Sequence, residues 1–171
     1  MLRLYEVLKT KMVPLLGVFL LFVLLVLPMT NDYLNDMQTP DPMFSYGRED
    51  IIKIADDLGE EGRSHYIYSR IFMDILWPVV YACTSYMLLS IAFKGTRMMG
   101  VIVLPFVGML LDFLENITMM HQMYAYPNLN STMINIGSIF TSMKWIVLAS
   151  IGVFIVTGIV FSLYGYINRV K

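Results

Sequence analysis

Five charged side chains lie within or at the edge of long apolar stretches of this 171-residue chain: Arg70, Asp74, Asp112, Glu115 and Lys144. Ionisable residues are costly inside a membrane, so they normally face the interior of a helix bundle and mark a structural pair or a site. Carboxylates placed there can hold the polar head of a ligand, and a carboxylate that stays protonated at neutral pH suits general acid or base chemistry.

Helical spacing gathers these charges, with two neutral polar side chains, on a few helix faces. Arg70, Asp74 and Tyr81 follow i, i+4 and i+11 spacing, which keeps them on one face. Pro78 has no N–H to donate to the carbonyl of Asp74, so that carbonyl stays free beside the carboxylate. The predicted ligand-binding residues are Arg70, Asp74, Tyr81, Asp112, Glu115, Asn116 and Lys144.

Depth along the helices predicts which charges meet. Glu115 and Lys144 both lie roughly 10 Å from the outer end of their stretches, with Asp74 shallower and Asp112 near the midplane. This favours an Arg70–Asp74 pair and a Lys144–Glu115 pair, and it leaves Asp112 without a cation. A carboxylate in that position is expected to be protonated or paired with a ligand at neutral pH. If the site is catalytic, Asp112 or Glu115 is the candidate general acid or base.

The elements that position these residues are apolar helices. The composition is 57% hydrophobic and 15% charged, and the mean hydropathy is +0.65, which is typical of a membrane protein. Four stretches are long enough to cross roughly 30 Å of hydrocarbon as helices. We predict an all-α, four-helix transmembrane bundle forming one integral membrane domain over residues 1–171, with spans at about 12–28, 71–93, 98–122 and 136–164.

The charge distribution predicts the orientation. The segments 1–11, 94–97 and 165–171 each carry a net charge of +2, whereas residues 31–63 hold nine acids against three basic residues. Basic loops stay on the cytoplasmic side. We therefore expect a protein of a plasma membrane, of the bacterial inner-membrane type. Both termini would lie in the cytoplasm, and residues 31–69 would form an outer loop.

That outer loop contains its own helical pattern. The stretch Glu49–Leu58 places apolar residues on one face and stops at Gly59, so we predict a short amphipathic helix that lies on the membrane or caps the bundle. His65, Tyr66 and Tyr68 follow it and are expected at the outer headgroup level, as an aromatic belt.

Several classes of function have no support in the sequence. There is no basic face for nucleic acid, and Cys83 alone provides neither a disulfide nor a cysteine metal site. A copper site is one interpretation of Met119, His121 and Met123, because thioether and imidazole groups bind Cu(I). On a helix, however, His121 points away from the two methionines. The motifs of standard hydrolases and nucleotide enzymes are absent from the sequence, so we expect no cofactor and no metal.

Three motifs are similar to those of a widespread group of small, uncharacterised bacterial four-span membrane proteins. They are D-x-x-x-P-x-x-Y at Asp74, Pro78 and Tyr81, D-x-x-E-N at Asp112, Glu115 and Asn116, and T-x-x-K-W at Thr141, Lys144 and Trp145. This resemblance covers most of the chain and implies the four-span fold without an activity.

The order of elements also resembles the EXPERA group, the emopamil-binding-protein superfamily of four-span sterol isomerases and lipid or amine receptors. A first span ends near Pro28, Asp32 and Asp36 follow in a long outer loop, and Asp74 precedes a span that ends at Lys94. The resemblance implies a pocket lined by acids. The group's catalytic histidine and glutamate pattern is not recognisable here.

The leading hypothesis is that a polar pocket in the outer half of the bundle binds an amphipathic or lipid-like molecule, with chemical modification of that molecule as an extension of the same hypothesis. A second hypothesis is a structural or accessory subunit, in which the charges only fix the helices together and a partner membrane protein docks. A third is a proton-coupled transporter, which would need a homo-oligomer because the chain has no internal repeat. The sequence does not decide whether the protein is an enzyme.

Overall fold

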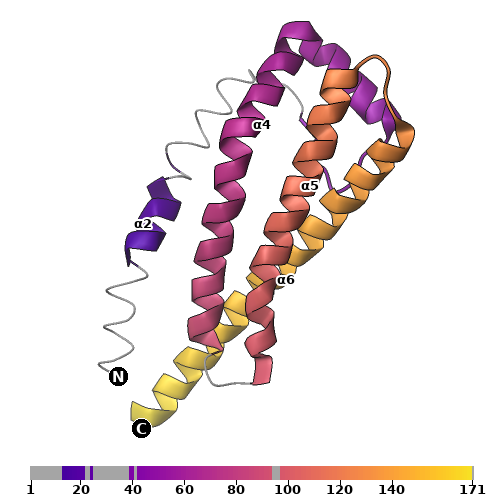
Figure 1. The fold of residues 1–171 in the computed structure, drawn as a ribbon. Coiled ribbons are helices and arrows are strands. Elements are labelled where there is room, and N and C mark those ends of the chain that lie inside the picture. The colour runs from indigo at the N-terminus through magenta and orange to yellow at the C-terminus, as the bar shows by residue number, and fades with distance from the viewer. Residues whose placement is uncertain (1–12, 22–23, 25–38, 41, 94–96, 171) are drawn as a thin grey trace.

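The computed structural model describes residues 13–21, 24, 39–40, 42–93 and 97–170, and every regular element within them is a helix (Figure 1). The elements are α2 (Val13–Leu21), α4 (Arg48–Ala92), the 3-10 helix η3 (Arg97–Val103), α5 (Leu104–Ala125) and α6 (Ser131–Val170). Three stretches are long and apolar enough to cross a membrane, within Arg48–Ala92, Gly100–Ala125 and Ser131–Phe161. The predicted all-helical fold is confirmed for the described residues, and three of its helices have the length and composition of membrane spans.

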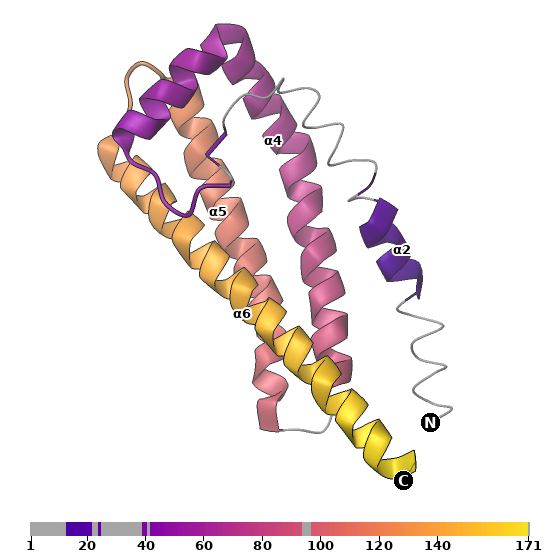
Figure 2. The same ribbon diagram turned by 180° about the vertical axis from the view of Figure 1, so that it is seen from behind.

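Parts of the predicted topology fall outside the described residues. Of the predicted first span, 12–28, mainly α2 is described, and the N-terminal tail, residues 31–38 and the turn at 94–96 are not. In the described part, α2 lies beside α4 on the side away from α5 (Figures 1 and 2). The contact includes the stacked rings of Phe19 and Trp77, whose centroids are 5.7 Å apart.

The helices α4, α5 and α6 form the body of the molecule, with α5 alongside both of the others and α6 crossing obliquely (Figures 1 and 2). The predicted span at 98–122 begins as the 3-10 helix η3, and α5 proper starts at Leu104 with Pro105 in its first turn. Proline has no N–H to donate, so the first turn is where a helix tolerates it best.

The helix α4 bends sharply at Gly59, which has φ 64° and ψ −175°. The segment Arg48–Leu58, here called the arm, folds over one end of the bundle (Figure 1). Its apolar face is buried against the ends of α5 and α6. The buried core there contains Ile51, Ile54, Ala55 and Leu58 of the arm with Met119, Met123, Leu129 and Ile134.

Residues 60–69, which the sequence analysis assigned to the outer loop, are the first turns of the long part of α4. Charge was the basis for assigning a loop there, but glutamate and arginine are good helix formers. The long part of α4 therefore begins before the apolar stretch that starts at Ile71.

A short segment of extended chain, residues 42–47, precedes the arm and is here called the strap. It runs along α6, and its backbone groups bond to side chains spaced i, i+4 and i+7 on that helix. The bonds are Tyr46 N–H to Ser138 Oγ (3.0 Å), Ser142 Oγ to the Phe44 carbonyl (2.8 Å) and Trp145 Nε1 to the Met43 carbonyl (3.0 Å). Non-helical backbone at the level of a membrane helix needs such partners.

Polar contacts fasten the arm to the connection between α5 and α6. The hydroxyl of Tyr126 donates to Asp56, and the guanidinium carbon of Arg63 lies 4.7 Å from the centre of the Tyr126 ring. Arg48 Nη1 donates to the carbonyl of Leu129 at 2.9 Å. The hydrogen bond to Asp56 raises the pKa of Tyr126, because it favours the protonated phenol.

Candidate functional site

The seven predicted site residues come together in one connected group, here called the polar cluster. Three helices contribute to it, and their facing surfaces bring side chains from distant parts of the sequence into contact. The members are Arg70, Asp74 and Tyr81 from α4, Asp112, Glu115 and Asn116 from α5, and Lys144 from α6.

Both predicted ion pairs are present. Arg70 Nη1 contacts Asp74 Oδ2, and Lys144 Nζ contacts Glu115 Oε2. The prediction that Asp112 has no cation is wrong, because Lys144 Nζ also lies 3.7 Å from Asp112 Oδ1. Asp112 and Glu115 are three residues apart on one helix and therefore neighbours on its surface. One ammonium thus serves two carboxylates.

Hydrogen bonds join the two ion pairs into one network. Tyr81 donates to Asp112 Oδ2 at 3.2 Å, and Asn116 Nδ2 donates to Asp112 Oδ1 at 3.4 Å. The carbonyl oxygen of Asn116 in turn accepts from Arg70 Nη1 at 3.3 Å. Asn116 therefore bridges the Arg70–Asp74 pair to the carboxylate of Asp112, and both oxygens of Asp112 have partners.

The polar cluster is buried, and its charges do not balance. It contains three carboxylates and two cations, and Glu115 is 1% exposed, Lys144 6%, Asp112 7% and Arg70 9%. Within the described residues, Glu115 Oε1 has no hydrogen-bond partner. Buried polar atoms in proteins nearly always have one, so this oxygen is an exception among the polar atoms of the cluster.

Tyr66 is a member of the site that the sequence analysis missed. It was expected in an aromatic belt, but it is 0% exposed while its neighbour Tyr68 is 65% exposed. Its ring centre lies 4.6 Å from the guanidinium carbon of Arg70, and its hydroxyl has no hydrogen-bond partner among the described residues. The signal was present in the sequence, because Tyr66 precedes Arg70 and Asp74 by four and eight residues and shares their face.

Tyr46 enters the site from the strap, and no helical spacing could have located it. Its hydroxyl accepts a hydrogen bond from Thr141 Oγ1 at 3.4 Å, between residues 95 positions apart. Burial raises the pKa of Tyr46 to about 12. Gly137 makes room for this arrangement, since a Cβ there would lie 2.7 Å from the Tyr46 hydroxyl and 2.6 Å from Thr118 Oγ1.

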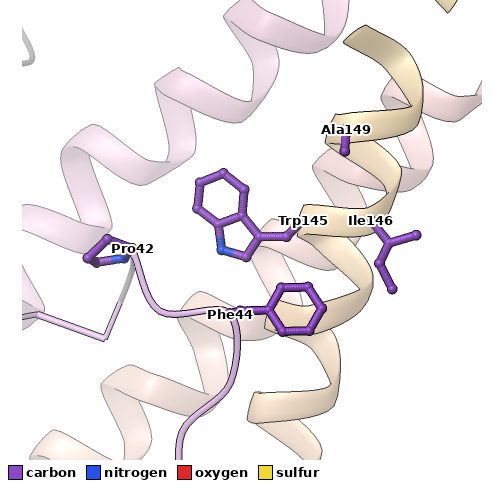
Figure 3. Close-up of a pocket in the computed structure, with 5 residues that line it drawn as sticks. All are labelled: Pro42, Phe44, Trp145, Ile146 and Ala149. Carbon is purple, nitrogen blue, oxygen red and sulfur yellow. The ribbon is translucent and has the colours of Figure 1, made fainter. Parts of the chain in front are cut away.

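An apolar pocket of about 370 Å³ lies between the strap and α6 (Figure 3). It is lined by Pro42, Phe44, Trp145, Ile146 and Ala149. None of the seven predicted site residues lines it, but the centre of the Trp145 ring is 5.5 Å from Lys144 Nζ. The pocket is therefore adjacent to the polar cluster and separated from it by an indole ring.

Comparison with protein-family models, curated proteins and solved structures finds no match to this chain. The geometry of the polar cluster therefore carries the functional conclusion.

The residues considered for copper are not arranged around a common point. Met119 and Met123 are each 2% exposed in the apolar core beneath the arm, whereas His121 is exposed. Across the described residues, histidine, cysteine and carboxylate side chains form no group of three that could hold a metal ion.

Proposed function

We propose that this chain is an integral membrane protein that binds an amphipathic or lipid-like molecule, whose polar head lies at the polar cluster. In this proposal the chain crosses a bacterial inner membrane four times. Both termini lie in the cytoplasm, and the arm lies on the outer side of the membrane. The three apolar helices and the charge distribution of the loops support it.

The observation that carries the proposal is that two buried polar atoms, Glu115 Oε1 and the Tyr66 hydroxyl, have no hydrogen-bond partner within the part of the chain that the structure describes. An unsatisfied buried group costs about 1–3 kcal/mol, and a head group placed between these atoms would remove that cost. Glu115 Oε1 can only accept, and the polar cluster already has one carboxylate more than it has cations. The head is therefore a hydrogen-bond donor, such as a hydroxyl or an ammonium, rather than an anion.

Among the carboxylates of the polar cluster, Asp74 has the most exposed side chain, at 23% against 11% for Asp112 and 2% for Glu115. Pro78, one turn along α4, leaves the Asp74 carbonyl as an additional acceptor. If the bound molecule is also modified, Asp112 or Glu115 is the group that transfers the proton.

The test is to identify what co-purifies. Protein reconstituted into phosphatidylcholine nanodiscs is examined by native mass spectrometry, comparing the parent with Asp112→Asn, Tyr66→Phe and Tyr86→Phe. Tyr86→Phe is the matched control, because this phenol of α4 packs on Phe106 outside the cluster. We expect a bound amphiphile in the parent and the control and loss of it in the other two variants. Bare protein in every sample would exclude the binding function.

The ion pairs favour a second candidate function, a structural one. Each cation of the polar cluster contacts a carboxylate, and the network joins α4, α5 and α6. In that case the cluster holds the helices together in an accessory subunit of another membrane protein. Neutralising any of the carboxylates would then lower the thermal stability of the detergent-solubilised protein, whereas a binding site tolerates or gains from neutralising Asp112 or Glu115.

A further inference from the structure

The pocket between the strap and α6 is lined by Trp145, the residue that follows Lys144 of the polar cluster on α6. The indole of Trp145 forms part of the pocket wall (Figure 3). The centre of the Trp145 ring is also 5.5 Å from Lys144 Nζ, a member of the polar cluster. A molecule with a head in the cluster and a chain of carbon atoms passing Trp145 would reach the pocket directly.

We infer that this pocket seats one alkyl chain of the molecule whose head occupies the polar cluster, an inference that rests on the proposed function. The five lining side chains are apolar apart from the indole nitrogen, and that nitrogen already donates to the Met43 carbonyl. The volume of about 370 Å³ falls within the range of small-molecule sites, about 300–1,000 Å³.

The pocket is open on the side that an alkyl chain would come from. Phe44 is 58% exposed, Ile146 56% and Trp145 37%, so its mouth is apolar and continuous with the outer surface of α6. On a membrane-spanning helix that surface faces hydrocarbon. A chain can therefore slide in from the bilayer without crossing a polar layer.

The hydrogen bonding of the strap argues for an alkyl chain and against a peptide. The Met43 and Phe44 carbonyls and the Tyr46 N–H are already bonded to α6. A peptide in the pocket would bring backbone donors and acceptors that need partners, and these strap groups are taken. A saturated chain needs none.

The experiment uses hexadecylamine carrying a photoreactive diazirine at mid-chain, added to the full-length protein in phosphatidylcholine nanodiscs. After illumination, peptide mass spectrometry locates the adducts, and unlabelled hexadecylamine is the competitor. The blocking variant is Ala149→Trp, which fills the pocket. The control is Met143→Trp on the same helix, where the side chain is 47% exposed and does not line the pocket.

We expect competable adducts on the pocket residues, reduced by about tenfold or more in Ala149→Trp, the equivalent of about 1.4 kcal/mol, and unchanged in Met143→Trp. Adducts spread over the exposed face of α6, with equal yields in both variants, would overturn the inference and leave only bulk lipid contact. Asp112→Asn reports separately on the head. Loss of labelling in that variant supports the proposed function. Unchanged labelling of the pocket would mean that the pocket binds the alkyl chain but that the polar cluster does not bind the head.

Discussion

Replacing Lys144 with methionine tests the electrostatics of the polar cluster most directly. Methionine keeps an unbranched apolar stem of similar reach but removes the ammonium that contacts Glu115 and lies 3.7 Å from Asp112. The cluster then retains three carboxylates and only the cation of Arg70.

The magnitude follows from burial. Removing one member of a buried ion pair costs about 3–5 kcal/mol, because it leaves the other charge uncompensated. Most of this cost falls on Glu115, which is 1% exposed and has no other partner among the described residues. Asp112 keeps the donors Tyr81 and Asn116. Adding Glu115→Gln to Lys144→Met removes the stranded charge, and the coupling energy of the two changes should be about 2–3 kcal/mol.

The assay is the free energy of unfolding in mixed micelles, followed by tryptophan fluorescence as the denaturing detergent is increased. Parent, Lys144→Met, Glu115→Gln and the double variant are compared, with Lys53→Met, at an exposed position in the arm, as the control. The control should lie within about 0.5 kcal/mol of the parent. A cost under about 1 kcal/mol for Lys144→Met, or a double variant no more stable than Lys144→Met, would refute the reasoning.

Three further perturbations have defined outcomes. Gly137→Ala places a Cβ as close as 2.6 Å to a side-chain oxygen and should lower the free energy of unfolding by about 1–3 kcal/mol. In the same micelle assay, Gly152→Ala inside α6, with nothing within 4 Å of its Cβ, should keep it unchanged or raise it by up to about 1 kcal/mol. Gly59→Ala forces alanine into φ 64° and should cost about 1–3 kcal/mol; equal stability would mean that the arm can repack. In an ultraviolet titration of the phenols, the pKa of Tyr126 should be above its ordinary value and return toward it in Asp56→Asn. The hydroxyl is a donor only when protonated, so its contribution to stability is complete below pH 10 and is lost as pH rises through the raised pKa.

Helical periodicity accounts for what could be predicted from the sequence. The face that carries Arg70, Asp74 and Tyr81 follows from spacing alone, and so does the pairing of Lys144 with Glu115 at equal depth. These inferences succeed because a charged side chain in an apolar helix is costly unless it faces the interior of the bundle and pairs with another group. The same spacing includes Tyr66, four residues before Arg70. Its position just before the apolar stretch had suggested an aromatic belt instead.

The strap accounts for most of what could not be predicted. It is not helical, so it has no period from which to infer a face, and its contacts join residues more than 90 positions apart. Tyr46 and the apolar pocket both depend on it. The sharing of Lys144 between two carboxylates also needed the structure, because Asp112 and Glu115 differ in depth by only one helical turn.

The order of synthesis gives the shared lysine a role in assembly. The helix α5 contains Asp112 and Glu115 but neither lysine nor arginine, and its cation arrives with α6, which the ribosome makes on the order of seconds later at about 5–20 residues per second. A nascent chain that ends at the loop after α5 therefore exposes two acids with no counter-charge from its own C-terminal side. If the chain spans a membrane as proposed, we expect this intermediate to be less stable in the bilayer than the complete chain, because Lys144 brings the counter-charge for both acids.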